Sequence, residues 1–316
     1  MLRINRYEPK DKALWDDFIS KSKNGTFLFR RDYMDYHSDR FADCSLMFWK
    51  GEELLAVMPA NIRGDTFISH EGLTYGGLIS DSRLTMADTI ETFELTNRWL
   101  RQNTNVKKVV YKPVPYIYCS LPSEEDLYVI LQRCGARIIA RDISSTIAMD
   151  CAPKWHRDRK YGAHKALREG VEVGQSSDFK GFWKVLTDNL RNTYGVAPVH
   201  SLEEMLLLKS RFPANIVLYT ATLDGEVLGG TVLYISRQVV HAQYISASAN
   251  GKHMRVIDAI YDQILNYDFE DVKYFDFGKS TERGGSFLND TLIYQKEGFG
   301  GRGVCYDTYQ WDVYDD

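Results

Sequence analysis

The chain contains the stretch Val272-Lys273-Tyr274-Phe275-Asp276-Phe277, which is followed directly by Gly278. A short run of aromatic and apolar residues predicts a buried strand, and the glycine ends it. A polar loop (279–285), a helical segment (287–297) and a last strand (305–311) follow. A strand that ends in an acid and a glycine and faces a helix carrying a lysine is a common way to form a pocket beside a sheet. An ordinary strand–loop–helix–strand connection is the alternative.

The same order of elements occurs twice along the chain. Each half predicts helices, a hairpin, a further strand, a long helix, a strand, a short helix and a strand. The hairpins turn at Lys50-Gly51-Glu52 and at Asp224-Gly225-Glu226, between apolar runs. The long helices fall at 86–100 and 255–267, where apolar residues recur at helical spacing. We therefore predict a duplicated α/β domain, with domains at 1–152 and 153–316.

The element order and the C-terminal stretch carry a family resemblance. Each half resembles the GNAT acetyltransferase fold, and two such units in tandem resemble the Fem-type aminoacyl transferases of cell-wall synthesis and related tandem acyltransferases. The residues at 274–278 and 295–301 are similar to the Fem-like "DFG … FK-x-x-FG" signature, with Gln295 in place of the usual aromatic residue. The resemblance implies an α/β (α+β) fold with two mixed, mostly antiparallel sheets flanked by helices, and acyltransferase activity.

The resemblance also implies where a cofactor binds. GNAT enzymes hold the coenzyme A pyrophosphate on a Q/R-x-x-G-x-G/A turn at a helix start, where backbone N–H groups bind anions. The matching segment here, 246–254, has one glycine and departs from that motif. We expect acetyl-CoA or another acyl-CoA to contact Ser246, Asn250, Gly251, Lys252 and Met254. The first half has Tyr75-Gly76-Gly77 at this place and no such turn, so the first domain is expected to be degenerate, with Tyr75 on the acceptor side.

Three residues are candidates for catalysis. Asp276 is expected to act as a general base or to orient an amine if burial raises its pKa; a strand-end acid paired with Lys296 or Lys279 is the alternative. Lys296 precedes Gly-Phe-Gly-Gly on an aromatic-flanked helix and is expected to face the same cleft; a surface lysine is the alternative. Tyr244 corresponds to the acyl channel of GNAT-type sites, or it packs in the core.

Further residues are candidates for binding the acceptor. The segment 154–170 holds six Lys and Arg residues against two acids, and in the Fem-like family this helix borders the cleft. The resemblance implies that Arg159 and Lys160 meet a phosphate of a nucleotide-linked substrate; a solvated helix face is the alternative. Gly278 is expected to border the substrate at the end of its strand.

Composition excludes several other classes of protein. The chain has 316 residues, 44% of them hydrophobic, and a net charge of −4, so no global positive charge attracts DNA. The five cysteines are widely spaced and no His or Cys cluster suggests a metal site. No signal peptide and no apolar run of about 18 residues is present. We therefore expect a cytoplasmic protein without a metal or a transmembrane segment.

Three functions fit these observations. The first is an N-acyltransferase that moves an acyl group from acyl-CoA to an amino group, with an amino sugar or a cell-envelope or polysaccharide precursor as the expected acceptor. The second is an aminoacyl-tRNA-dependent transferase acting on a peptidoglycan precursor. The third is a non-catalytic binding protein on the same fold. Fem-type enzymes that bind tRNA often carry a long helical arm in the second half, and no such insertion occurs here. The first function is therefore preferred, with tRNA as the second choice.

Overall fold

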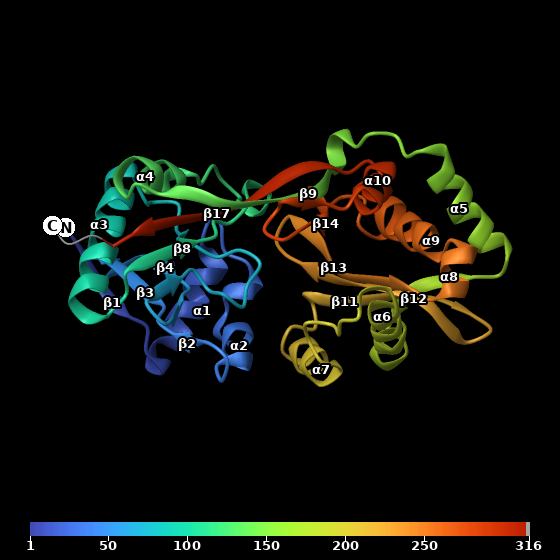
Figure 1. Cartoon of the computed structure of the whole chain (residues 1–316), viewed down its shortest axis with the longest axis horizontal. Helices are drawn as coiled ribbons and strands as arrows, with labels where there is room; N and C mark the ends of the chain where they lie inside the picture. Colours follow the sequence, from blue (N-terminus) through green and yellow to red (C-terminus); the bar gives the residue numbers. More distant parts are fainter. Residues whose placement is uncertain (314–316) are drawn as a thin grey trace. The chain divides into compact units, whose positions relative to one another are not determined.

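The computed structural model describes residues 1–313. The chain folds into two units (Figure 1): unit 1 consists of Met1–Asp142, Thr281–Phe287 and the segment from Cys305 onward, and unit 2 of Ile143–Ser280 and Leu288–Val304. Strands β9 (Arg137–Ala148) and β17 (Arg302–Asp312) each begin in one unit and end in the other. Unit 1 is therefore completed by segments that follow unit 2 in the sequence, an exchange that the sequence pattern did not predict.

Within the described residues, unit 1 contains two groups of paired strands and four α-helices. One group has the order β1-β3-β4-β7, and the other runs β17-β8-β6-β5-β2. The strands are β1 (Leu2–Arg6), β2 (Ala42–Asp43), β3 (Leu46–Lys50), β4 (Glu53–Met58), β5 (Asn61–Arg63), β6 (Thr66–Ile68), β7 (Ile79–Ser80) and β8 (Lys108–Tyr111). The helices are α1 (Lys12–Lys21), α2 (Arg31–Met34), α3 (Met86–Asn103) and α4 (Glu125–Arg133). Phe93 and Tyr111 pack against Trp311 of β17, so the returning strand forms part of this core.

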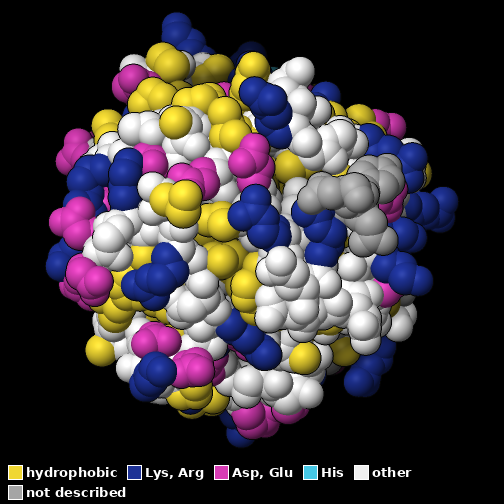
Figure 2. Space-filling view, turned by 90° about the vertical axis from the view of Figure 1, so that its left-hand side faces the viewer, with side chains coloured by type: hydrophobic (Ala, Val, Ile, Leu, Met, Phe, Trp, Pro, Cys, Tyr) yellow, Lys and Arg dark blue, Asp and Glu magenta, His cyan; other side chains and the backbone are white. Residues whose placement is uncertain are grey.

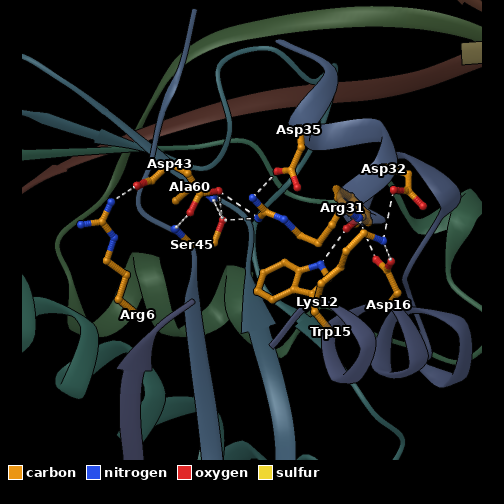
Figure 3. A network of polar contacts seen from close by, with 11 residues as sticks. Arg6, Lys12, Trp15, Asp16, Arg31, Asp32, Asp35, Asp43, Ser45 and Ala60 are labelled. Atoms are coloured by element: carbon orange, nitrogen blue, oxygen red, sulfur yellow. Dashed lines mark hydrogen bonds and ion pairs between the residues drawn. The ribbon is translucent and has the colours of Figure 1, made fainter. Parts of the chain in front are cut away.

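A buried arginine links the helices and strands of unit 1 (Figure 3). The side chain of Arg31 is 4% exposed and donates to Asp43 at 2.9 Å and to Asp35 at 2.5 Å. Its guanidinium lies 3.9 Å from the centre of the Tyr7 ring, and its backbone N–H donates to Asp16. Buried cations are stable only when paired in this way. This network stabilises the fold of unit 1.

The surface of the molecule carries charges of both signs. On the left of the face that Figure 2 shows, Lys and Arg side chains are interspersed with Asp and Glu side chains, and along its right-hand edge Lys and Arg side chains are more frequent.

Unit 2 is built on the strand order β10-β11-β12-β13-β14-β9. The strands are β10 (Glu172–Ser176), β11 (Ile216–Leu223), β12 (Glu226–Ile235), β13 (Val239–Ala247), β14 (Tyr274–Lys279) and the second half of β9. Neighbouring strands are antiparallel, except that β13 and β14 are parallel. The short strands β15 (Thr281–Glu282) and β16 (Phe287–Leu288) follow β14 in the sequence, and all but Leu288 belong to unit 1.

Helices cover both faces of the unit 2 sheet (Figure 1). They are α5 (Arg157–Arg168), α6 (Phe179–Tyr194), α7 (Leu202–Arg211), α8 (Ala249–Met254), α9 (Val256–Gln263) and α10 (Asp290–Gly298). α5 and α9 lie on one face, and α6 and α7 on the other. Tyr261 of α9 packs edge-on against Phe275, Phe277 and Phe299 in the core of the first face.

The predicted fold class is confirmed: the structure is a mixed α/β fold with mostly antiparallel sheets. Both predicted hairpins form, and Gly51 and Gly225 adopt positive φ at their turns. The helix predicted at 255–267 is less regular than expected. Arg255 adopts φ 65° and separates α8 from α9, and a π-helical turn, Ile264–Asp268, ends the segment. Strands β1 and β10 were not predicted.

Candidate active site

Asp276 lies at the centre of β14 and is completely buried. One carboxylate oxygen accepts hydrogen bonds from the hydroxyls of Ser144 (2.5 Å) and Thr146 (2.8 Å) on β9, and the other lies 2.8 Å from Nδ1 of His241. Burial acts to raise the pKa of Asp276, but these three partners outweigh it and the pKa lies below its ordinary value. The condition for Asp276 to act as the base, a raised pKa, is therefore not met.

His241 lies opposite Asp276 because β13 and β14 are in parallel register, with His241 paired to Asp276. A carboxylate only accepts hydrogen bonds, so Nδ1 of His241 donates to it and Nε2 carries the lone pair of the neutral ring. The side chain is 15% exposed, and within residues 1–313 no group forms a hydrogen bond with Nε2. A Cβ at position 278 would lie 3.2 Å from Cε1 of His241, so the glycine leaves this edge of the ring uncovered.

Lys296 reaches the end of β14 from α10. It is 6% exposed, and its ammonium donates to the carbonyl groups of Gly278 and Lys279, both at 2.8 Å. Burial lowers the pKa of Lys296 to about 8, with Asp276 acting in the opposite direction. The side chain is therefore not on the surface. It supports the backbone at Gly278, whose φ of 77° lies in the left-handed region.

Strands β13 and β14 part immediately after this group. Their pairing covers three residue pairs and ends at His241 and Asp276, although β13 continues to Ala247 and β14 to Lys279. The β12–β13 pairing has a bulge next to this place, because Val232 pairs with Tyr244 and Leu233 with Ala242. Beyond this point no residue of β14 pairs with β13, and the carbonyl groups of Gly278 and Lys279 are bonded to Lys296 instead. His241 thus stands at the point where the strands diverge.

A cavity of about 270 Å³ lies between the start of α9 and α10. Its lining includes the cations Arg159, Lys252 and Arg255 and the acid Asp258. Asp258 accepts from Arg159 at 3.1 Å and from Arg255 at 2.6 Å, so both guanidinium groups are held in place. Burial raises the pKa of Asp258, although both arginines act to lower it. The excess of cations makes this cavity suitable for an anionic group.

Two other cavities lie in unit 2. One of about 590 Å³ is bounded by α6, the β11–β12 turn and the turn from β13 to α8, and Lys252 and Asn192 line it. Another, of about 430 Å³, lies beside α5 and the end of α9, and Lys160 and Trp155 line it. Arg159 and Lys160, neighbours in the sequence, therefore face different cavities.

The residues expected to bind the cofactor do not all lie on a surface. Ser246 and Met254 are buried, and Met254 belongs to the core of unit 2. Gly251 is buried against β12, where an added Cβ would lie 2.3 Å from the carbonyl oxygen of Leu228. Asn250 and Lys252 are exposed. Of the five expected contacts, Gly251 and Lys252 line the cavity between α9 and α10.

Two further candidates are held by aromatic neighbours. The hydroxyl of Tyr244 lies 2.6 Å from Nδ1 of His200, and its ring packs edge-on against Trp183. Burial raises the pKa of Tyr244 to about 12. Tyr75 is buried in unit 1, where it contacts Phe29 and Tyr118. Core packing is thus the observed setting of Tyr75, and Tyr244 lies at the α6 face of the sheet.

Sequence reasoning missed His241, Ser144 and Thr146. The available signal was weak: a histidine in an alternating strand, and two hydroxyl residues two positions apart, which place both side chains on one face of β9. Neither pattern indicates that the residues meet Asp276. The parallel register that brings them together depends on the tertiary fold.

Within residues 1–313, no group of three or more His, Cys, Asp or Glu side chains has an arrangement that could hold a metal ion. In the same part of the chain, no helix is both long enough and apolar enough to cross a membrane.

Comparison with known proteins defines the class. Residues 155–284 match the family model of the acetyltransferase (GNAT) domain. The match identifies residues 155–284 as an acetyltransferase domain of the GNAT class, for which acyl transfer is the general reaction. A search among curated proteins gives no match.

Solved structures share the architecture over the whole chain. FemX superposes with a TM-score of 0.68 at 10% identity, covering 98% of this chain and 97% of FemX. The C-terminal domain of a putative lysylphosphatidylglycerol synthetase from Agrobacterium fabrum gives 0.61 at 11% identity, covering 97% and 92% of the two chains. A tandem GNAT protein from the clavulanic acid biosynthesis pathway gives 0.54 at 10% identity and covers both chains fully. At these identities the similarity establishes the fold.

Proposed function

We propose that the protein is an N-acyltransferase that moves an acyl group from acyl-CoA to an amino group. The observation that carries this proposal is that β13 and β14 separate after His241 and Asp276. The cationic cavity between α9 and α10 supports it. An extended donor can pair with β13 along the parted edge, with its reactive end at His241 and its phosphates at the cavity.

The dimensions fit such a donor. From Ala242 to Ser248 the chain advances six residues, which in an extended strand span about 20 Å. Acyl-CoA carries its thioester at the end of an extended pantetheine arm, with the pyrophosphate at the other end. The cations Arg159, Lys252 and Arg255 line the cavity in which the pyrophosphate would lie. Charge-assisted hydrogen bonds from arginine to phosphate are short and strong.

The acceptor is proposed to be a primary amine, of the amino-sugar or cell-envelope precursor class. The general reaction of the class, acyl or aminoacyl transfer, requires a nucleophile at the reactive end of the donor. A basic ring nitrogen at the point where β13 and β14 part suits an amine, which must lose a proton as it is acylated. The cytoplasm, where acyl-CoA is available, is the proposed location.

Two matched variants test the position of the donor. Thr291→Glu adds a negative charge to the cavity between α9 and α10, and Asn192→Glu adds the same charge to the larger cavity beside α6; both positions are exposed. Isothermal titration with acetyl-CoA is expected to show affinity about tenfold weaker in Thr291→Glu, because a like charge opposes the pyrophosphate. Asn192→Glu is expected to bind as the wild type does.

The opposite pattern would place the donor in the cavity beside α6. If the wild type binds neither acetyl-CoA nor coenzyme A, acyl-CoA is not the donor. Transfer from an aminoacyl-tRNA to an amine acceptor would then be the function to measure.

A further inference from the structure

We propose that His241 is the general base of acyl transfer and that Asp276 is its positioning residue. This inference rests on the proposed function for the donor and the acceptor. It assigns the proton transfer to a side chain that the family resemblance does not indicate. Three features support it: the hydrogen bonds that hold Asp276 and His241, the other titratable groups nearby, and the position of His241 where β13 and β14 stop pairing.

The carboxylate of Asp276 is fixed from three sides. Ser144, Thr146 and His241 all donate to it, and it is completely buried, so it cannot itself contact a substrate. An ionised carboxylate with these partners orients the imidazole and stabilises the imidazolium that forms when Nε2 takes a proton. Its function is therefore to hold His241 in one tautomer and one orientation.

The free edge of His241 is kept open. Nε2 forms no hydrogen bond within the described part of the chain, and the neighbouring position in β14 is Gly278, which has no side chain to cover the ring. The ring lies where the pairing of β13 with β14 ends. A thioester extended along β13 would present its carbonyl group at this point.

Two other titratable groups near the end of β14 and on β13 are poorly suited to be the base. Lys296 has a pKa of about 8 and donates to two backbone carbonyls, so at neutral pH it is mostly protonated and already bonded. Tyr244 has a pKa raised to about 12 and is bonded to His200. Of the three groups, His241 is the one with a ring nitrogen, Nε2, that no described residue bonds.

The reaction balances without a further reactant. As the nitrogen of the amine forms a bond with the thioester carbonyl carbon, Nε2 of His241 takes the proton that the nitrogen loses. When the tetrahedral intermediate breaks its C–S bond, the imidazolium returns that proton to the departing thiolate. The products are an amide and coenzyme A, and His241 is again neutral.

The variant His241→Asn tests the proposal, because its amide can still donate to Asp276 near the position of Nδ1 but offers no basic nitrogen. Acetyl-CoA is the donor, D-glucosamine and UDP-glucosamine are the acceptor probes, and release of free thiol is the readout. Slow hydrolysis of acetyl-CoA, in which water replaces the amine, is followed in parallel. We expect kcat to fall by about 10²–10⁴-fold with little change in acetyl-CoA affinity. His164→Asn, an exposed histidine on α5, is the matched control and is expected to keep full activity.

Two further measurements separate a catalytic role from a structural one. Imidazole added to His241→Ala is expected to restore part of the activity, which a structural defect would not allow. Asp276→Asn is expected to lower kcat and to move the acidic limb of the kcat/KM profile to lower pH, because the carboxylate that stabilises the imidazolium is gone. Asp276 on β14 is the titratable group in contact with His241, and Lys296 on α10 interacts with Asp276.

The outcomes distinguish this inference from the proposed function. If acetyl-CoA binds and His241→Asn keeps wild-type rates of both amine transfer and hydrolysis, His241 is not the base, while the donor assignment stands. If the wild type does not bind acetyl-CoA, the proposed function fails, and the role of His241 in thioester aminolysis fails with it.

Discussion

The ammonium of Lys296 and the carbonyl oxygen of Gly278 are 2.8 Å apart, so a side chain from α10 holds the end of β14. A second hydrogen bond of the same length goes to the carbonyl of Lys279. Through these bonds, Lys296 fixes the backbone beside the ring of His241. Lys296 therefore stabilises the candidate site through the backbone of β14.

Replacing Lys296 is expected to affect stability as well as activity. Lys296→Met keeps the length of the side chain but removes the hydrogen bond to the buried carbonyl of Gly278 and the one to the partly buried carbonyl of Lys279, which is expected to cost about 1–3 kcal/mol. Urea unfolding at pH 7 measures the loss. Lys279→Met, at a partly exposed position at the end of β14, is the comparison. An unchanged midpoint for Lys296→Met would show that these hydrogen bonds contribute nothing to stability.

The pH dependence of the free energy of unfolding is expected to show the contribution of Lys296. The folded-state pKa of Lys296 is about 8 and its ordinary value is 10.5, so between these values the unfolded state binds more protons than the folded state. The free energy of unfolding of the wild type is therefore expected to rise from pH 8 to pH 10.5 relative to Lys296→Met. Paired urea titrations across this range test the sign. A difference that stays constant would place the folded pKa near its ordinary value.

The hydroxyls that hold Asp276 are expected to contribute separately to stability. Ser144→Ala and Thr146→Val each remove a hydrogen bond to a buried carboxylate, an interaction worth about 1.5–3 kcal/mol. Because Asp276 has a lowered pKa, its contribution is present above about pH 4 and is lost as the pH falls further, so both variants should approach the wild type at low pH. Ser145→Ala, from the buried position between them, is the control. Equal losses in all three variants would indicate a packing effect.

The packing of α8 against β12 depends on Gly251. A Cβ there would lie 2.3 Å from the carbonyl oxygen of Leu228, so Gly251→Ala is expected to force a backbone shift costing about 1–3 kcal/mol. Thermal unfolding measures this loss, and Asn250→Ala at the exposed neighbouring position should unfold like the wild type. A fully stable Gly251→Ala would show that β12 can move away. Reduced acetyl-CoA affinity in a Gly251 variant therefore reports binding only if its stability is intact.

In unit 1, Arg31 is expected to contribute to stability. Arg31→Met leaves the carboxylates of Asp35 and Asp43 without their buried cation, but both are partly exposed and water can solvate them, so a loss of about 1–3 kcal/mol is expected. Arg31→Lys is expected to recover only part of this loss, because an ammonium cannot reproduce the fork that reaches both acids. Urea unfolding followed by tryptophan fluorescence tests both, since Trp15 lies 5.5 Å from the guanidinium. Full stability in Arg31→Met would contradict this role.

Much of the fold could be predicted from the sequence because its elements have local signals. The hairpin turns carry Gly51 and Gly225 at positive φ, and α3 shows helical apolar spacing along most of its length. The segment 274–278 placed Asp276 at the centre of the candidate site, but its partners could not be derived. These partners are brought to Asp276 by the register of β14 with β13 and β9. His241 and Thr146 lie 35 and 130 positions from Asp276 in the sequence. Local patterns contain no information on such pairing.

The predicted binding residues differ in a similar way. Lys252 is an exposed lysine, as its sequence position suggested, and it lines the cationic cavity. Met254 instead lies in the core, directly before Arg255, whose left-handed conformation changes the direction of the chain. Arg159 and Lys160 were predicted as a pair, but adjacent helical positions point about 100° apart. The structure accordingly assigns them to two cavities.

The passage of β9 and β17 between the units has a consequence for how the polypeptide acquires its structure. Tyr309 and Trp311 belong to the core of unit 1, but the whole of unit 2 is synthesised between them and the rest of that core. While unit 2 is being made, β8 lacks its β17 neighbour and its edge is exposed to pairing with other chains. Unit 1 therefore cannot be completed on the ribosome before unit 2 has been synthesised. A gene cut between the halves would yield an N-terminal fragment that lacks a strand of its own sheet.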